Sequence, residues 1–175
     1  AVLATTAHLA AARGNRVVYQ VAVGDEAPRD PDAGGPGLGE AVTDPTKLRQ
    51  VVMNLLSNAA KFTENGVITL VARREARPGG DWIEVQVHDT GVGIAPQERE
   101  NLFQPYGQAS AVVQGKYGGT GLGLTISEKL CALMGGGITL VSEKGRGSCF
   151  TVRVPADWAA DAEPAPAPVL AAAAV

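Results

Sequence analysis

The sequence has little that would indicate a membrane, nucleic-acid or zinc-binding protein. No apolar run approaches the roughly 20 residues that a membrane-spanning helix needs, and the first eight residues lack the features of a secretion signal. The net charge of −3 provides no field to hold nucleic acid or an anionic membrane. The two cysteines, Cys131 and Cys149, fit no zinc-ligand spacing. We expect two reduced core cysteines in a cytoplasmic protein, with no nucleic-acid partner and no direct membrane contact.

The remaining composition is that of one globular domain with less regular ends. A chain of 175 residues with 45% apolar residues can bury a sizeable core. Residues 1–16 begin with an alanine-rich stretch that we expect to be a helical lead-in. Residues 24–40 are rich in Gly, Pro and Asp and predict an exposed, mobile loop. The domain is expected to span residues 17–155, and the Ala/Pro-rich residues 156–175 to form a disordered linker.

Hydrophobic periodicity predicts a mixture of hairpins and helices. Strands are expected at residues 17–23, 67–73, 82–89, 138–142 and 149–154. Helices are expected from Asp44–Pro45 to Asn65–Gly66, after Ala95–Pro96, and over residues 122–134. In the last helix Leu122, Ile126, Leu130 and Leu133 form an apolar stripe. These elements predict an α/β (α+β) two-layer sandwich.

The long helix carries the first candidate site. Its apolar face consists of Leu48, Val51, Val52, Leu55, Leu56, Ala59 and Phe62. Asn54, Asn58 and Lys61 form a separate polar stripe at i, i+4 and i+7. Amide oxygens can ligate Mg²⁺, and a lysine can neutralise phosphate, although a plain solvated face would produce the same pattern.

Asp89 is the second candidate. Strict alternation in residues 82–89 places it on the core-facing side, where a carboxylate needs hydrogen-bond donors. Gly91 and Gly93 follow and leave room for a flat ligand against the backbone. A buried acceptor beside such a gap suits the exocyclic amine of adenine. A strand end capped by Asp89 is the equally plain alternative.

Glycines 118, 119, 121 and 123 precede the last helix and would expose backbone N–H groups to a phosphate. The segment is neither a P-loop nor a dinucleotide fingerprint, and a simple hinge is the alternative. Upstream, residues 102–108 could anchor one end of a mobile lid, with Lys116 and Tyr117 near its other end. Phe103 is alternatively a core residue.

In this order and spacing, the four motifs resemble those of the GHKL ATPase superfamily, and within it the catalytic domain of histidine kinases. Residues 47–63 resemble the N box, 89–94 the G1 box, 102–108 the F box and 119–124 the G2 box. The resemblance covers residues 17–155 and implies the Bergerat ATP-binding fold, with a mixed sheet backing one layer of helices. Two departures are the long loop at 24–40 and Gly115, which stands where many relatives carry an arginine.

The resemblance also implies the ligands, ATP and Mg²⁺, and the role of each matching residue. Asp89 would accept from the adenine amine, Gly91 and Gly93 would let the base approach, and Ser148 would help through water. Asn58 would hold the metal, Asn54 would help to order the metal and phosphates, and Lys61 would contact phosphate. These three are the expected catalytic residues. Lys116 would substitute for the lid arginine. The remaining expected ATP contacts are Ile94, Phe103, Tyr117, Gly119, Thr120, Gly121, Leu122, Gly123 and Leu124.

The resemblance further implies a protein histidine kinase domain whose phosphoacceptor lies elsewhere. Neither His8 nor His88 has the family's acceptor surroundings, so the isolated chain is not expected to autophosphorylate. The expected partners are the dimerisation helices and a response-regulator receiver domain, and the parent protein could be membrane-anchored. A nucleotide-responsive binding module and a GHKL ATPase without phosphotransfer are the alternatives.

Overall fold

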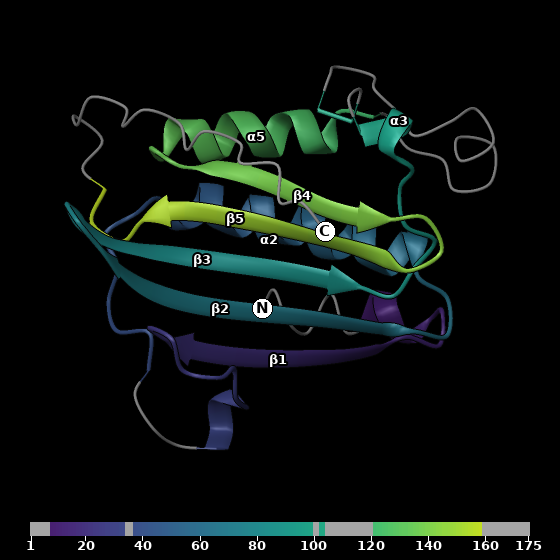
Figure 1. Ribbon diagram of the computed structural model, residues 1–175, viewed down its shortest axis with the longest axis horizontal. Coiled ribbons are helices and arrows are strands. Elements are labelled where there is room, and N and C mark those ends of the chain that lie inside the picture. The colour runs from purple at the N-terminus through teal and green to yellow at the C-terminus, as the bar shows by residue number, and fades with distance from the viewer. Residues whose placement is uncertain (1–7, 34–36, 100–101, 104–120, 159–175) are drawn as a thin grey trace.

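The chain folds as a five-stranded mixed sheet with helices packed on one face (Figure 1). The computed structural model describes residues 8–33, 37–99, 102–103 and 121–158. The strand order is β1-β2-β3-β5-β4; β1 is parallel to β2, and the other neighbours are antiparallel. This arrangement confirms the predicted two-layer α/β sandwich. The elements are β1 (Arg16–Val23), η1 (Pro31–Ala33), α2 (Pro45–Phe62), β2 (Val67–Arg77), β3 (Gly80–Asp89), α3 (Pro96–Arg99), α5 (Gly123–Leu133), β4 (Gly137–Glu143) and β5 (Gly147–Pro155).

The start of α2 follows directly from its sequence. The Asp44 carboxylate accepts hydrogen bonds from the backbone N–H groups of Thr46 and Lys47, both at 2.9 Å. Pro45 occupies the first turn, where its missing N–H is not needed. The helix ends at Phe62, and the N–H of Thr63 caps it by donating to the Ala59 carbonyl. The predicted start of the helix is confirmed, whereas the helix ends at Phe62, before the predicted Asn65–Gly66.

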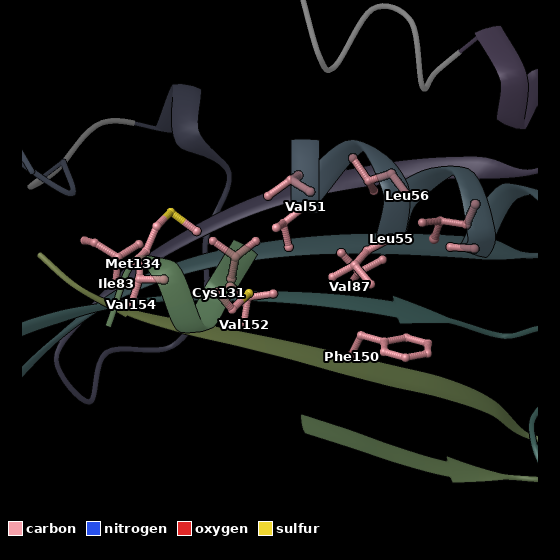
Figure 2. Packing of buried hydrophobic residues seen from close by; sticks show 14 of the residues in the cluster. Val51, Leu55, Leu56, Ile83, Val87, Cys131, Met134, Phe150, Val152 and Val154 are labelled. Carbon is pink, nitrogen blue, oxygen red and sulfur yellow. The ribbon is translucent and has the colours of Figure 1, made fainter. Parts of the chain in front are cut away.

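The core lies between the helices and the inner face of the sheet. Figure 2 shows residues of α2 facing those of β3 and β5. Alternate residues of β3 point inward, as predicted from the sequence pattern. On α2, Phe62 is only half-buried and Ala60 is buried instead, because the core-facing positions recur as adjacent pairs. The largest fully buried apolar side chains are Leu55, Leu56, Ile68, Met134, Val51, Val87, Val152 and Val154.

The apolar stripe predicted on the last helix is only partly buried: Leu130 packs against the core, but the stripe as a whole does not. In α5 the buried residues are the small Thr125, Ser127 and Cys131, whereas Ile126 is 43% exposed and Leu133 is 62% exposed. Ser127 is buried because α5 packs closely on α2, where short side chains allow the two backbones to approach. Thr125 is buried on a different face, where it contacts the Phe103 carbonyl. Leucine spacing alone did not reveal which face would meet the other helix.

The second cysteine is also not where the sequence pattern placed it. Cys131 is buried and free, as predicted, but Cys149 points to the outer face of the sheet. There its Sγ atom lies 3.5 Å from Nε2 of His88 on the neighbouring strand. On the same face, Glu84 is 3% exposed and its carboxylate is 2.6 Å from Nε of Arg153. A cross-strand ion pair thus accounts for a carboxylate buried on the face expected to be polar.

Both flanks of the predicted domain pack against it where the structure describes them. Ala10, in the helical residues 8–11, is fully buried in the core. After β5, Ala156 is 2% exposed and Trp158 packs against the turn at Gly135. The boundaries at 17 and 155 stay predictions. Within the described residues, no helix is both long and apolar enough to span a membrane.

Candidate functional site

The predicted site residues gather where β3 ends, beside the end of α2 and the turn between β4 and β5. Figure 1 shows the end of β3 and the β4–β5 turn at the same end of the sheet. Asp89 closes β3 and lies opposite Ser148 of β5 in the strand register. The backbone N–H of Val92 donates to the carbonyl of Phe62, the last residue of α2, at 3.2 Å. The fold therefore places the segment that resembles the G1 box, residues 89–94, beside the end of the segment that resembles the N box, residues 47–63.

The Asp89 carboxylate lies in a partly desolvated environment with backbone donors. The N–H of Gly91 donates to its Oδ1 atom at 2.9 Å. Burial raises the pKa of Asp89 above its usual range, although N–H groups of Gly91 and Ser148 and the Thr63 hydroxyl act in the opposite direction. A carboxylate that is partly desolvated at a fixed position, with its pKa shifted by burial, is typical of a binding site.

The glycines after Asp89 are required by the protein itself as well as by any ligand. A Cβ on Gly91 would lie 2.3 Å from the Phe62 carbonyl oxygen. Gly93 has a φ of +61°, and its Cβ would lie 1.9 Å from the Glu143 carbonyl oxygen. The sequence predicted that a flat ligand approaches at these positions. In the structure the Phe62 and Glu143 carbonyls lie this close, and the approach of a base stays a prediction.

A small hydroxyl network holds the residues next to Asp89. Ser142, a buried residue of β4, accepts a hydrogen bond from the N–H of Ile94 at 2.8 Å. The Ser142 hydroxyl also donates to the Gly147 carbonyl at 2.9 Å and lies 3.0 Å from the Ser148 hydroxyl. Ser148 thus presents its backbone N–H to Asp89 and its hydroxyl to Ser142. The predicted contacts of Ile94 and Ser148 with a nucleotide stay predictions.

Asn54 joins α2 to α5. Its Nδ2 atom donates to the Ser127 hydroxyl at 2.8 Å. A Cβ on Gly123, the first residue of α5, would lie 2.4 Å from Asn54 Oδ1, so glycine is needed for this contact. The amide predicted to order metal and phosphates therefore also sets the position of the start of α5.

Asn58 and Lys61 are half-buried on the same helix. Burial lowers the pKa of Lys61, and the nearby positive charge of Arg13 lowers it further. The Lys61 Nζ atom also lies 5.0 Å from the centre of the Phe62 ring. Among the described residues no group of three or more His, Cys, Asp or Glu side chains could hold a metal. A magnesium site would thus depend on the Asn58 amide oxygen together with the ligand's own phosphates.

The start of α5 leaves backbone N–H groups without a side-chain cap. Leu122 occupies the N-cap position and makes no side-chain hydrogen bond. Gly121 before it has a φ of +70°. Leu124 and Phe103 are partly buried against the core, and Thr125 donates to the Phe103 carbonyl at 3.0 Å. Phe103 is thus anchored beside α5. The predicted roles of Lys116, Tyr117, Gly119 and Thr120 lie outside the described residues.

The sequence pattern did not predict that several other residues lie at this site. Asn15 lies in the supposed lead-in, yet it is 7% exposed and donates to the Thr63 carbonyl at 2.8 Å. Thr63, Ser142 and Gly147 each lie within a segment that the pattern assigned only to a helix end, a strand or a turn. A hydroxyl residue directly after the last apolar position of a helix was the only available signal for Thr63.

Comparisons with known proteins agree with this geometry. The model of the family described as histidine kinase-, DNA gyrase B-, and HSP90-like ATPase matches residues 43–157. The sensor histidine kinase RcsC of Escherichia coli (strain K12) is 51% identical over 112 residues, 64% of this chain and 11% of that protein. The signal transduction histidine-protein kinase BarA of the same strain is 44% identical over 117 residues, 66% of this chain and 13% of that protein. The chain thus spans about a tenth of these relatives.

Two solved structures share the fold. Full-length ShkA in complex with AMPPNP superposes with a TM-score of 0.65 and 30% identity, over 94% of this chain and 30% of that one. The mycobacterial sensor histidine kinase MprB gives a TM-score of 0.60 at 22% identity, over 90% of this chain and 94% of that one, which supports the fold alone. From the family match and the arrangement of the motifs, the chain belongs to the histidine kinase-, DNA gyrase B- and HSP90-like ATPases.

Proposed function

We propose that this chain is the ATP–Mg²⁺-binding catalytic domain of a sensor histidine kinase. It would supply the γ-phosphoryl group to a histidine on separate dimerisation helices of its parent protein. The observation that carries the proposal is the Asp89 carboxylate, which is partly desolvated, held by backbone N–H groups and joined to the end of α2. Such an acceptor at a fixed position suits the amino group of adenine.

The other predicted residues fit the rest of a nucleotide. The uncapped N–H groups at the start of α5 suit a phosphate, and the Lys61 ammonium would add positive charge. Asn58 would provide an amide oxygen to magnesium, which when bound would neutralise phosphate charge. In the transfer, a nitrogen of the acceptor imidazole would form a bond to the γ-phosphorus. The bond between the γ-phosphorus and the β–γ bridging oxygen would break, and ADP would leave. The chain's residues would position and shield the phosphates.

Neither described histidine suits the role of acceptor. His8 is exposed in the helical residues 8–11 and lacks the acceptor motif. His88 Nε2 lies 2.9 Å from Gln86 Oε1, and burial lowers its pKa below the usual value. We therefore propose that the acceptor is in another part of the parent protein, and that a receiver domain takes the phosphoryl group afterwards. A cytoplasmic location belongs to the same proposal.

Nucleotide binding is tested by calorimetric titration of the chain with ATP and MgCl₂. The variant Asp89→Asn should bind ATP about 10- to 100-fold more weakly, because the charge-assisted acceptor is lost. The matched control is Asp25→Asn, an exposed carboxylate in the turn after β1. Equal ATP affinity in the wild type and the Asp89 variant would remove the central claim.

Phosphotransfer is tested with γ-labelled ATP and separately supplied dimerisation helices of the parent protein. Label should appear on those helices only in the presence of this chain, and never on this chain alone. Steady ATP hydrolysis without a labelled protein would favour an ATPase. Binding with neither outcome would favour a nucleotide-responsive module.

A further inference from the structure

Thr63, the residue directly after α2, has a buried hydroxyl that makes no hydrogen bond of normal geometry with any described residue. The residue is 0% exposed. Its methyl group faces Gly66, since Cγ2 lies 2.5 Å from the position of a Cβ there. Its hydroxyl faces Gly91, with Oγ1 2.8 Å from the corresponding position. Among the described residues, none gives this oxygen a hydrogen bond of normal geometry. A hydroxyl in such a place is costly unless it acquires a partner.

The available partner is Asp89. The Oδ1 atom of Asp89 is also 2.8 Å from the position of a Cβ on Gly91, so the two side-chain oxygens converge on this glycine. The Thr63 hydroxyl already helps to lower the pKa of Asp89 against the effect of burial. Because a hydroxyl hydrogen rotates freely about its C–O bond, it can be directed to the carboxylate without any backbone movement.

The backbone of Thr63 is fixed from the opposite side. Its N–H donates to the Ala59 carbonyl at 3.0 Å, which closes α2. Its carbonyl accepts a hydrogen bond from Nδ2 of Asn15 at 2.8 Å. A β-branched side chain on a backbone held at both groups has little freedom to turn away. These restraints keep the hydroxyl directed at the Asp89 carboxylate.

We propose that Thr63 is a positioning residue for Asp89: its hydroxyl donates to the carboxylate, holds its orientation and keeps it charged when a base with an amino group binds. The inference rests on the proposed function, because it concerns how that site selects adenine. Thr63 would act only through Asp89 and would make no contact with the phosphates. Its removal should therefore matter for the amino group of adenine and for no other part of the nucleotide.

The test compares ATP with inosine triphosphate, which has a carbonyl in place of the adenine amino group. The variant Thr63→Val keeps the shape and loses the hydroxyl. It should bind ATP about five- to tenfold more weakly than the wild type, because one hydrogen bond to a charged acceptor is lost. Its affinity for inosine triphosphate should be unchanged. Thr63→Ser should recover most of the ATP affinity, and Thr63→Ala should behave like Thr63→Val. Thr139→Val on β4 is the matched control and should bind both nucleotides as the wild type does.

The outcomes separate this inference from the proposed function. Unchanged ATP affinity in Thr63→Val, or equal loss for both nucleotides, overturns the role of Thr63, and so does a failure of Thr63→Ser to recover binding. In each of these cases, weaker ATP binding by Asp89→Asn than by the wild type would still support the proposed function. A wild type that binds both nucleotides equally, with no effect of Asp89→Asn, contradicts the adenine site itself. Unchanged binding of inosine triphosphate also shows that the hydroxyl-free variants are folded.

Discussion

The turn between β4 and β5 contains two glycines with positive φ, of which only one has other atoms close to the position of a Cβ. Comparing them separates the cost of the backbone conformation from the cost of a steric clash. Gly145 has a φ of +82° and nothing within 4 Å of the position of a Cβ. Gly147 has a φ of +104°, and its Cβ would lie 1.9 Å from the Asp89 carbonyl oxygen. Alanine at either position incurs about 1–2 kcal/mol for the left-handed conformation. At Gly147 the clash with the β3 backbone should add about 1–3 kcal/mol, since backbone cannot move aside as a flexible side chain can.

Urea unfolding of Gly145→Ala and Gly147→Ala, followed by circular dichroism, measures this difference. With a slope of about 2 kcal/mol per M, the Gly147 variant should unfold at roughly 0.5–1.5 M less urea than the Gly145 variant. The Gly147 variant should also bind ATP more weakly, because the displaced carbonyl belongs to Asp89. Equal midpoints and equal ATP affinities would refute the argument from close approach.

Three further predictions concern stability. Burial raises the pKa of Asp89 in the folded state, so the stability that depends on this group falls as pH rises from its ordinary value of 3.8 through the raised value. Asp89→Asn should therefore melt at a higher temperature than the wild type at pH 7, and the difference should shrink below pH 3.8. Arg153→Gln should lower the free energy of unfolding by about 2–3 kcal/mol, because the Glu84 carboxylate stays buried without its partner. Glu84→Gln should lower it by less than about 1 kcal/mol, because no buried charge is left. Equal losses of the two variants in urea unfolding would contradict this. Trp158→Ala should cost about 2–3 kcal/mol by uncovering the turn at Gly135, and an unchanged unfolding midpoint would show that this packing is dispensable.

Local signals in the sequence were enough to predict most elements of the fold. Asp44 and Pro45 define the start of α2 through hydrogen bonds made within three residues, so they can be predicted without tertiary information. Alternation in β3 predicted its buried face, because the period of a strand is two residues. The β1–β2 pair is parallel and joins segments about 50 residues apart, and its partner could not be read from local pattern.

The failures share a physical cause. The face of α5, the position of Cys149 and the burial of Glu84 are all decided by contacts between distant segments. Hydrophobicity favoured Ile126 and Leu133 for the core, but close packing on α2 buries Ser127, and the contact with Phe103 buries Thr125. Residue type is a weak guide where two backbones approach closely.

The candidate site was predictable where a residue's own chemistry is unusual for its place. Asp89 on an inward position of a strand is such a case. Asn15 and Thr63 are ordinary polar residues in the sequence. Only the fold brings Asn15 to the end of α2 and the Thr63 hydroxyl to Asp89. Supporting residues of this kind carry no local signal.

The Asn15 side chain has a practical consequence for choosing where to cut the chain in recombinant work. It donates to the Thr63 carbonyl and accepts from the N–H of Gly66, so it satisfies the end of α2 and the approach to β2 together. The family match begins at residue 43 and therefore omits both Asn15 and β1, although β1 pairs with β2 along its whole length. A fragment trimmed to the matched range would expose one edge of the sheet and leave buried polar groups unpaired. The unit to express begins before Ala10, at least 33 residues upstream of the matched range.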